Sequence, residues 1–373
     1  MSRDKTIVLY SSGLIKLRVF ASIPQIPGTR LYLLCKKFHI KDSFFSNYDD
    51  IKDKKIIYFK NKQDALKKIK KLKPDVVITT TPDEELKKYN NTVFAAHGLY
   101  GKKEFLLYPQ GPPHWEGFSL YCGADKDYYK WLKNVSRHVV LNTLPQFDLA
   151  YKYSVQSPRR DYFLSKLGRN FNTIILFIGY GGRLLKMGDV DDDDHDCFKA
   201  IRQTVKWARK NNALVILKLR KTHKETMKFL IKQSLKRIWT IGYILFYAGL
   251  KYNKNVYFAY PHEGVYFYFF ADKFILTGSS TTEVEAALTG KPVILFKTKS
   301  IGYYDSHDLI KYRVALPASS VRELKQRLNE RSKVNLKNIR QYKKERNILF
   351  DGRHGERLIK AVMHRFFKRK GKS

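Results

Sequence analysis

Short apolar runs recur along this chain, and segments with apolar residues at helical spacing lie between several of them. The runs have the length and bulk of buried strands. We predict strands over Thr6–Tyr10, Arg30–Cys35, Lys55–Phe59, Val76–Thr80, Thr92–Ala96, Val139–Leu141, Thr173–Ile178, Ala213–Leu217, Val256–Ala259, Phe274–Leu276 and Val293–Phe296. In Asn61–Leu72 the apolar residues have helical spacing with lysines opposite, which predicts an amphipathic helix. Strand alternating with helix is typical of an α/β fold built on parallel sheets.

The pattern runs through the chain in two series, which predicts two α/β domains. The polar and basic segment Ser154–Asn170 separates them, and we interpret it as a linker or hinge. The predicted domains are residues 1–155 and 156–340, followed by a C-terminal helix and basic tail over 341–373. In that last helix, Arg357–Phe367, the predicted apolar side consists of Leu358, Val362, Met363, Phe366 and Phe367.

The stretch Ala271–Phe296 has the pattern of a strand, a helix and a second strand, with hydroxyl groups in the first turn. A helix N-terminus offers backbone N–H groups and the positive end of a dipole, which together suit a phosphate. The candidate phosphate ligands are Thr277, Ser279, Ser280 and Thr281. Ser and Thr are also the commonest helix caps, so an ordinary N-cap explains this turn alone at least as well.

Two further strands of the second series end in glycines or cations. Thr173–Ile178 leads into the glycine-rich turn Gly179–Arg183, and Ala213–Leu217 leads into a basic segment. Ligands of open α/β sheets bind beyond the carboxyl ends of strands, and glycines let backbone amides approach a phosphate closely. The candidate ligands here are Gly179, Gly181, Gly182, Arg183 and Arg220. A plain tight turn and a basic surface loop explain the two segments equally well.

Two histidines are candidates for proton transfer, because imidazole titrates near neutral pH. His97 directly follows the strand Thr92–Ala96, and His223 lies in the basic segment after Ala213–Leu217. A structural role for His97 is the open alternative.

The acidic segment Asp189–Asp196 could suggest a metal site, but its spacing lacks the Gly and the bidentate Glu of a calcium loop. The predicted helix Phe198–Lys210 follows directly, and acids just before a helix favour its dipole. We therefore predict a solvated helix N-terminus here, with no metal site and no obligatory divalent ion.

The charge of the chain favours a polyanionic partner. There are 72 Lys and Arg against 34 Asp and Glu, which gives a formal net charge of +38. Nucleic acid, an anionic membrane surface and a phosphate-rich substrate all fit, as does a genome-wide lysine bias. The most apolar segment, Ile238–Leu250, is shorter than the roughly 20 residues of a spanning helix. The first residues carry no apolar signal segment. We expect a cytoplasmic protein, peripheral on the inner face of the membrane.

Several short motifs resemble those of the CDP-glycerol glycerophosphotransferases, the teichoic-acid polymerases and primases. His97-Gly98 followed by Lys102 resembles their HG-x-x-x-K turn, and Pro145–Asp148 resembles their P-R-x-D turn. His223 stands where the family has its His-Pro motif. Asp351-Gly352 with Arg357 resembles the family's D-G-x-x-x-x-R segment.

Residues Ser279–Leu288 and Gly290–Val293 are similar to the S-S-T-x-x-x-E-A-L and G-K-P-V patterns of capsular polysaccharide transferases, of the Kdo-transferring and sialyltransferase-like type. Together the resemblances imply a GT-B architecture, with two Rossmann-like domains facing a central cleft. They also imply a transferase that uses a nucleotide-activated sugar or polyol donor, with cytidine favoured over uridine as the nucleoside. We expect no obligatory cofactor. The acceptor would be a glycan or a lipid-linked acceptor in cell-surface polysaccharide synthesis.

The resemblance also assigns roles to the candidate residues. His97 would act as the general base for the acceptor, and His223 and Arg220 would lie near the donor phosphates. Glu285, one turn into the predicted helix, would bind the nucleotide ribose. Two other functions stay open: a UDP-sugar 2-epimerase of the same fold, and a basic nucleic-acid-binding protein. The 25 Tyr and 24 Phe residues are compatible with nucleic-acid binding, although no RNP, KH, zinc-finger or helix-turn-helix pattern is present.

Overall fold

The structure is a computed structural model. It describes residues 4–12, 19–36, 54–89, 91–96, 99, 116–123, 125–155, 157–179, 192–219, 254–259, 265–278, 280–298, 305–330 and 334–367. The chain divides into two compact units. Unit 1 comprises Met1–Lys152 and Lys343–Ser373, and unit 2 comprises Tyr153–Tyr342.

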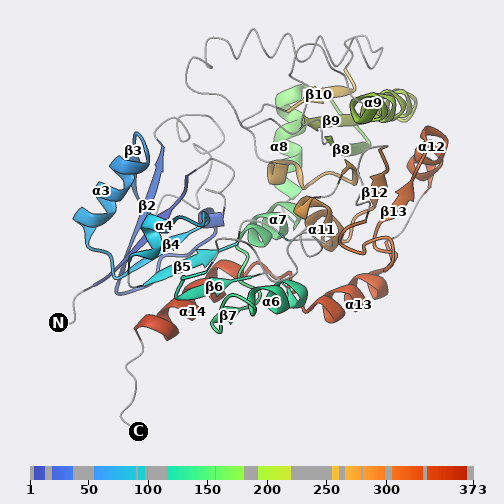
Figure 1. The fold of residues 1–373 in the computed structure, drawn as a ribbon. Helices are drawn as coiled ribbons and strands as arrows, with labels where there is room; N and C mark the ends of the chain where they lie inside the picture. Colours follow the sequence, from blue (N-terminus) through green and yellow to red (C-terminus); the bar gives the residue numbers. More distant parts are fainter. Residues whose placement is uncertain are drawn as a thin grey trace. The chain divides into compact units, whose positions relative to one another are not determined.

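In the described residues of unit 1, seven strands form one parallel sheet (Figure 1). Their order is β3-β2-β1-β4-β5-β6-β7. The strands are β1 (Lys5–Tyr10), β2 (Thr29–Lys36), β3 (Lys55–Phe59), β4 (Val76–Thr79), β5 (Thr92–Ala95), β6 (Leu120–Cys122) and β7 (Val139–Val140). The parallel pairing predicted from the sequence is confirmed for this sheet.

Several helices of unit 1 begin at side-chain caps. They are α3 (Lys62–Leu72), α4 (Glu84–Lys87), α6 (Lys126–Leu132), most of α7 (Gln146–Val155), the end of α13 (Leu336–Arg346) and α14 (His354–Phe366). Asn61, the first residue of the predicted helix, caps α3 by accepting a hydrogen bond from the Asp64 N–H. Ala65 and Ile69 of α3 pack on Val8 and Val77 of the sheet.

The C-terminal helix α14 is held in unit 1 at its first turn. The two carboxylate oxygens of Asp148 accept the N–H groups of His354 at 2.8 Å and Gly355 at 2.7 Å. A Cβ atom at Gly355 would lie 2.5 Å from the Ser22 carbonyl oxygen, so only glycine allows this approach of the two backbones. The Pro145–Asp148 turn and the start of α14 therefore form one structural joint.

In the described residues of unit 2, six parallel strands form a second sheet in the order β10-β9-β8-β11-β12-β13. The strands are β8 (Thr173–Gly179), β9 (Ala213–Leu219), β10 (Val256–Phe258), β11 (Lys273–Thr277), β12 (Val293–Phe296) and β13 (Leu316–Ala318). The helices are α8 (Ser157–Leu167), α9 (Asp192–Lys210), α11 (Thr281–Leu288), α12 (Val321–Asn329) and most of α13, with a 3-10 turn η3 (Val265–Tyr268).

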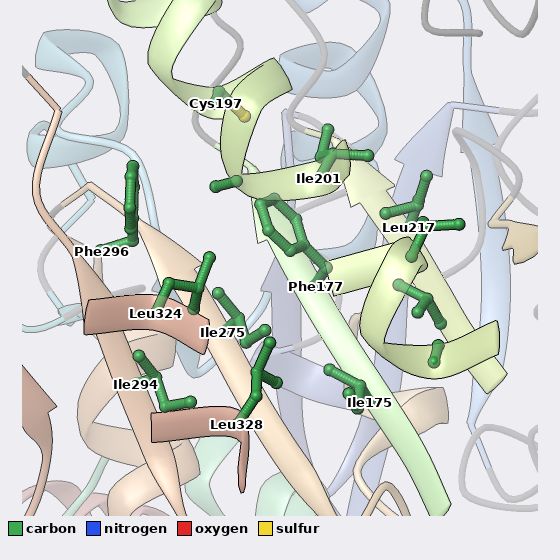
Figure 2. Packing of buried hydrophobic residues seen from close by; sticks show 14 of the residues in the cluster. Ile175, Phe177, Cys197, Ile201, Leu217, Ile275, Ile294, Phe296, Leu324 and Leu328 are labelled. Atoms are coloured by element: carbon green, nitrogen blue, oxygen red, sulfur yellow. The ribbon is translucent and has the colours of Figure 1, made fainter. Parts of the chain in front are cut away.

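Helices α9 and α12 cover the same part of this sheet. Figure 2 shows Ile201 of α9 and Leu324 of α12 among the side chains of Phe177, Ile275 and Ile294 from three neighbouring strands. All five are buried, at 0% exposure. This packing fixes the strands whose ends form the candidate site.

The structure corrects two predictions from the sequence. The predicted linker Ser154–Asn170 is helical for most of its length, because α7 extends to Val155 and α8 spans Ser157–Leu167. Phe163 of α8 is buried and its ring packs on those of Tyr257 and Tyr268, so one apolar face keeps this basic segment folded. In addition, α9 begins at Asp192, so the acids from there to Asp196 lie inside the helix and not before it.

Candidate functional site

The carboxyl ends of three neighbouring strands lie side by side in the unit 2 sheet. In the strand register, Gly179 at the end of β8 pairs with Leu219 of β9 on one side and with Thr277 of β11 on the other. Thr277 in turn pairs with Phe296 of β12. The three turns that the sequence singles out therefore leave the sheet at one edge, next to each other.

This edge is also a topological switch point. From β8 the chain proceeds outward through β9 to β10, then returns to the other side of β8 and proceeds outward through β11, β12 and β13. Connections that diverge from neighbouring strands leave room at the carboxyl edge, which is where open α/β sheets bind ligands. Gly179 and Thr277 lie on the two sides of this point.

Of the residues predicted for the site, the structure describes Gly179, Thr277, Ser280, Thr281 and Glu285. All five come from β8 or the β11–α11 unit at this edge. The other predicted residues lie outside the described residues: His97, Gly181, Gly182, Arg183, Arg220, His223 and Ser279.

The turn between β11 and α11 depends on a glycine. Gly278 has φ of 107°, a conformation that residues with a side chain rarely adopt. Ser280 then caps α11, and its Oγ accepts the Thr282 N–H at 3.0 Å. The hydroxyl of Thr277 is directed away from this turn, since it is buried and donates to the Cys197 Sγ at 3.7 Å.

Glu283 is a buried acid at this helix start that the sequence analysis does not select. Its carboxyl group accepts the Ser280 N–H, which completes a capping box of the Ser-x-x-Glu type. Burial and the nearby Asp305 carboxylate raise the pKa of Glu283 well above its ordinary value. Its Oε2 atom has no hydrogen-bond partner within the described part of the chain. The Ser280–Glu283 spacing is visible in the sequence and could have identified this residue.

Glu285 is held by an aromatic group. The Tyr266 hydroxyl donates to Glu285 Oε1 at 2.7 Å, and both residues are buried. The Tyr266 ring packs edge-on against Phe269, whose ring packs in the same way on Phe274 of β11. The carboxylate of Glu285 is therefore fixed relative to the strand that ends at the site.

Unit 1 has its own switch point, between β1 and β4, and hydroxyl groups follow both strands. Ser12 and Thr81 share a hydrogen bond of 2.9 Å between their side-chain oxygens. The Thr79 hydroxyl accepts the Thr81 N–H at 3.0 Å and so shapes the turn. Sequence analysis did not select these residues, although Ser11-Ser12 and Thr79–Thr81 stand directly after two apolar runs.

Within the described residues, no group of three or more His, Cys, Asp or Glu side chains is arranged to hold a metal ion. No helix in the same part of the chain is long and apolar enough to cross a membrane.

Comparisons with known proteins link this geometry to a fold. No protein-family model and no curated protein matches the chain. Among solved structures, a glycosyltransferase from Rickettsia africae aligns with 99% of this chain and 100% of its own, at 11% identity and a TM-score of 0.54. The wall teichoic acid polymerase TagF aligns with 98% of this chain and 90% of its own, at 10% identity and a TM-score of 0.59. The UDP-GlcNAc 2-epimerase from Neisseria meningitidis aligns with 96% of this chain and 100% of its own, at 12% identity and a TM-score of 0.58.

The chain has the GT-B fold. Two parallel α/β sheets, each in its own unit, are the elements of this architecture. At identities of 10–12%, the likeness applies to the fold and not to the reaction.

Proposed function

We propose that the protein is a glycosyltransferase or polyol-phosphate transferase that binds a nucleotide-activated donor in unit 2. The observation that carries this proposal is the meeting of three strand ends at the unit 2 switch point, where Gly179 and Thr277 pair in register. The turns that follow are rich in glycine, cations and hydroxyls, which suits a pyrophosphate or phosphate. The GT-B fold is compatible with this chemistry.

In this proposal the donor phosphate lies against the N-terminus of α11. Ser279, Ser280 and Thr281 bind its oxygens, and the turn Gly179–Arg183 and Arg220 surround it. When the bond between the transferred group and the donor phosphate breaks, its electron pair stays on the phosphate oxygen. Fixed N–H groups and cations stabilise that growing charge more in the transition state than in the ground state. Glu285, held by Tyr266, would bind the ribose.

The acceptor would bind in unit 1. His97 follows β5 and would take the proton of the attacking acceptor hydroxyl as it bonds to the transferred group. Ser12 and Thr81 at the neighbouring switch point offer hydroxyl groups that suit a polyhydroxyl acceptor such as a glycan. A cytidine nucleotide is the narrower proposal for the donor, supported by the motifs that resemble the CDP-glycerol enzymes and by the fold shared with TagF.

Nucleotide binding tests the donor site directly. A saturating cytidine nucleotide, at about 100 times its Kd, is expected to raise the melting temperature by about 5–10 °C. CMP, CDP, UDP and ADP are compared by thermal shift. Ser280→Ala is expected to weaken the response about tenfold, because a hydrogen bond to a charged group is lost.

Ser320→Ala is the matched control for that variant. Ser320 caps α12 in the same unit by accepting the Glu323 N–H, as Ser280 caps α11. Both variants should lose about 1 kcal/mol of stability, but only Ser280→Ala should lose nucleotide response. Equal nucleotide responses in the two variants, or no response of the wild-type protein to any nucleotide, would count against the donor site.

Removing the proposed proton-transfer groups tests the chemistry. His97→Ala and His223→Ala are each expected to lower kcat/KM for donor turnover by about 100-fold. His138→Ala replaces an exposed histidine of unit 1 and should leave the rate unchanged. Full turnover in both variants would remove the catalytic assignment of these residues.

The fold shared with a UDP-GlcNAc 2-epimerase makes an epimerase the second candidate. An epimerase needs no acceptor, so product analysis separates the two functions. Conversion of a UDP-sugar to its epimer in the absence of any acceptor would favour the epimerase.

A further inference from the structure

The last helix that the structure describes is α14 (Figure 1). Its last turns carry a mixed apolar and basic stripe that the proposed reaction does not use. An open groove of about 530 Å³ lies along it. The groove is lined by residues at positions i, i+3, i+4 and i+7 of the helix: Lys360, Met363, His364 and Phe367. These four residues form one continuous helical face.

The apolar side that the sequence predicts for α14 has a buried part and an accessible part. Leu358 and Val362 are fully buried in unit 1, as predicted. Met363 and Phe367, by contrast, are only half-buried, although they belong to the same predicted side. The helix therefore uses its first turns for packing and leaves apolar side chains accessible at its end.

The groove has basic surroundings. The Lys5 ammonium group lies 5.5 Å from the centroid of the Phe367 ring, and Lys360 and Arg365 are exposed on the helix. Lys360 also pairs with Glu356, which is the acidic group nearest in the helix. In the sequence, the six residues after Phe367 read KRKGKS and add four positive charges. Among the described residues, Lys5 and Lys360 thus place positive charge beside the apolar stripe.

We propose that this face of α14 docks the protein on the surface of an anionic lipid bilayer. Met363 and Phe367 enter the boundary between headgroups and acyl chains, while Lys5 and Lys360 face the lipid phosphates. Two half-buried apolar side chains among cations match a surface on which acyl chains lie beneath anionic headgroups. The proposal is independent of the proposed transferase function, because it concerns a face of unit 1 and requires no turnover.

Two other occupants fit this face less well. A single-stranded RNA would stack its bases on aromatic faces, but the Lys5 ammonium group lies over the Phe367 ring and Met363 has no aromatic face. A second copy of the chain would bring together two molecules that each carry a formal net charge of +38, and like charges repel.

Vesicle sedimentation of the full-length protein tests the proposal. Vesicles of phosphatidylcholine with about one third phosphatidylglycerol are expected to bind the protein at least tenfold more strongly than phosphatidylcholine alone at low salt. Met363→Ser/Phe367→Ser is expected to lower the partition coefficient for the anionic vesicles about tenfold. Lys5→Gln/Lys360→Gln is expected to lower it roughly fivefold per charge and to reduce its salt dependence.

A matched control replaces two exposed apolar residues elsewhere. Leu336 and Tyr162 are 62% and 59% exposed on α13 and α8, and Leu336→Ser/Tyr162→Ser should bind vesicles like the wild-type protein. Circular dichroism and melting temperature check that each variant is folded. Equal losses of vesicle binding in Met363→Ser/Phe367→Ser and in Leu336→Ser/Tyr162→Ser would overturn the proposal. Equal binding of the wild-type protein to neutral and anionic vesicles would also overturn it. So would a Met363→Ser/Phe367→Ser variant that loses binding to a poly(U) RNA while keeping its binding to vesicles.

Discussion

Replacing Arg346 with methionine is expected to lower the free energy of unfolding by about 3–5 kcal/mol. The Arg346 guanidinium donates from Nε to Asp125 Oδ2 at 2.9 Å and from Nη1 to Asp127 Oδ2 at 2.6 Å, and its Nη2 also contacts Asp125. The Asp125 side chain is 0% exposed and that of Arg346 is 8% exposed. Methionine keeps most of the volume of the side chain but leaves the Asp125 carboxylate buried without its cation.

Chemical denaturation of the wild type and three variants measures this effect. Arg365→Met replaces an exposed arginine of α14 and should change stability by less than about 0.5 kcal/mol. Arg346→Met/Asp125→Asn should recover part of the loss, because it removes the buried charge together with its partner. The Asp125 side chain also caps α6 through the Tyr128 N–H, so recovery depends on the asparagine oxygen accepting the same bond. A loss below 1 kcal/mol in Arg346→Met would contradict a stabilising role for this contact.

Sequence alone could not predict the Asp125–Arg346 contact. The two residues are 221 positions apart, and neither stands in an apolar pattern that indicates burial. Local signals were more informative. The amphipathic helix α3 and most of the longer strands follow from residue type and apolar spacing within a few positions of each other, and the structure confirms them. The sequence analysis did not predict the strands β6 and β13, although it predicted β7 and β10, which are equally short or shorter. Pro317 at the centre of β13 argues against a strand when only the sequence is considered.

The candidate site also has features that the sequence could predict and features that it could not. That phosphate-friendly turns follow apolar strands could be predicted, because a parallel strand and its connection are neighbours in sequence. That β9, β8 and β11 are adjacent could not, since strand order depends on how each connection crosses the sheet. The hydrogen bond from Tyr266 to Glu285 was also beyond sequence analysis, because it depends on a 3-10 turn packing against a helix.

Two of the motifs that resemble those of the glycerophosphotransferases have a structural role in this chain. Asp148, from the Pro145–Asp148 turn, binds the first N–H groups of α14. Asp351 and Arg357 pair with each other beside that helix start. These motifs join the C-terminal segment to unit 1, which is a role that their spacing in the sequence does not reveal.

Acid is expected to weaken that joint through His354. The His354 Nδ1 atom accepts the Leu144 N–H at 3.2 Å, and Nε2 donates to the Leu349 carbonyl oxygen at 2.7 Å. Both nitrogens are therefore used by the neutral ring. Burial, helped by the nearby Arg357 charge, lowers the pKa of His354 from 6.5 to about 4, although the hydrogen bond to the Leu349 carbonyl and the Asp351 charge oppose the shift. Protonation would remove the acceptor for the Leu144 N–H and place a charge in the core.

Because the folded pKa lies below the unfolded one, the contribution of the neutral ring is complete above about pH 6.5 and is lost as the pH falls toward 4. Between pH 7.5 and pH 4 the wild type should lose about 3 kcal/mol relative to His354→Asn, whose side-chain oxygen can accept the Leu144 N–H without titrating. The pKa of Asp148 is raised by burial to about 6, so its protonation stabilises the fold over part of the same range. Asp148 is present in both proteins, and the difference between their unfolding free energies isolates His354.

Denaturant unfolding of both proteins at half-unit steps of pH gives that difference directly. His364→Asn, at an exposed position of the same helix, is the control and should follow the wild type at every pH. A constant difference between wild type and His354→Asn from pH 7.5 to pH 4 would mean that His354 has the same pKa in the folded and unfolded states. In that case a neutral imidazole would not contribute to the stability of the joint between α14 and the Pro145–Asp148 turn. A difference that grows by about 1.4 kcal/mol per pH unit below 6.5 is the signature expected for a histidine that folding forces to release its proton.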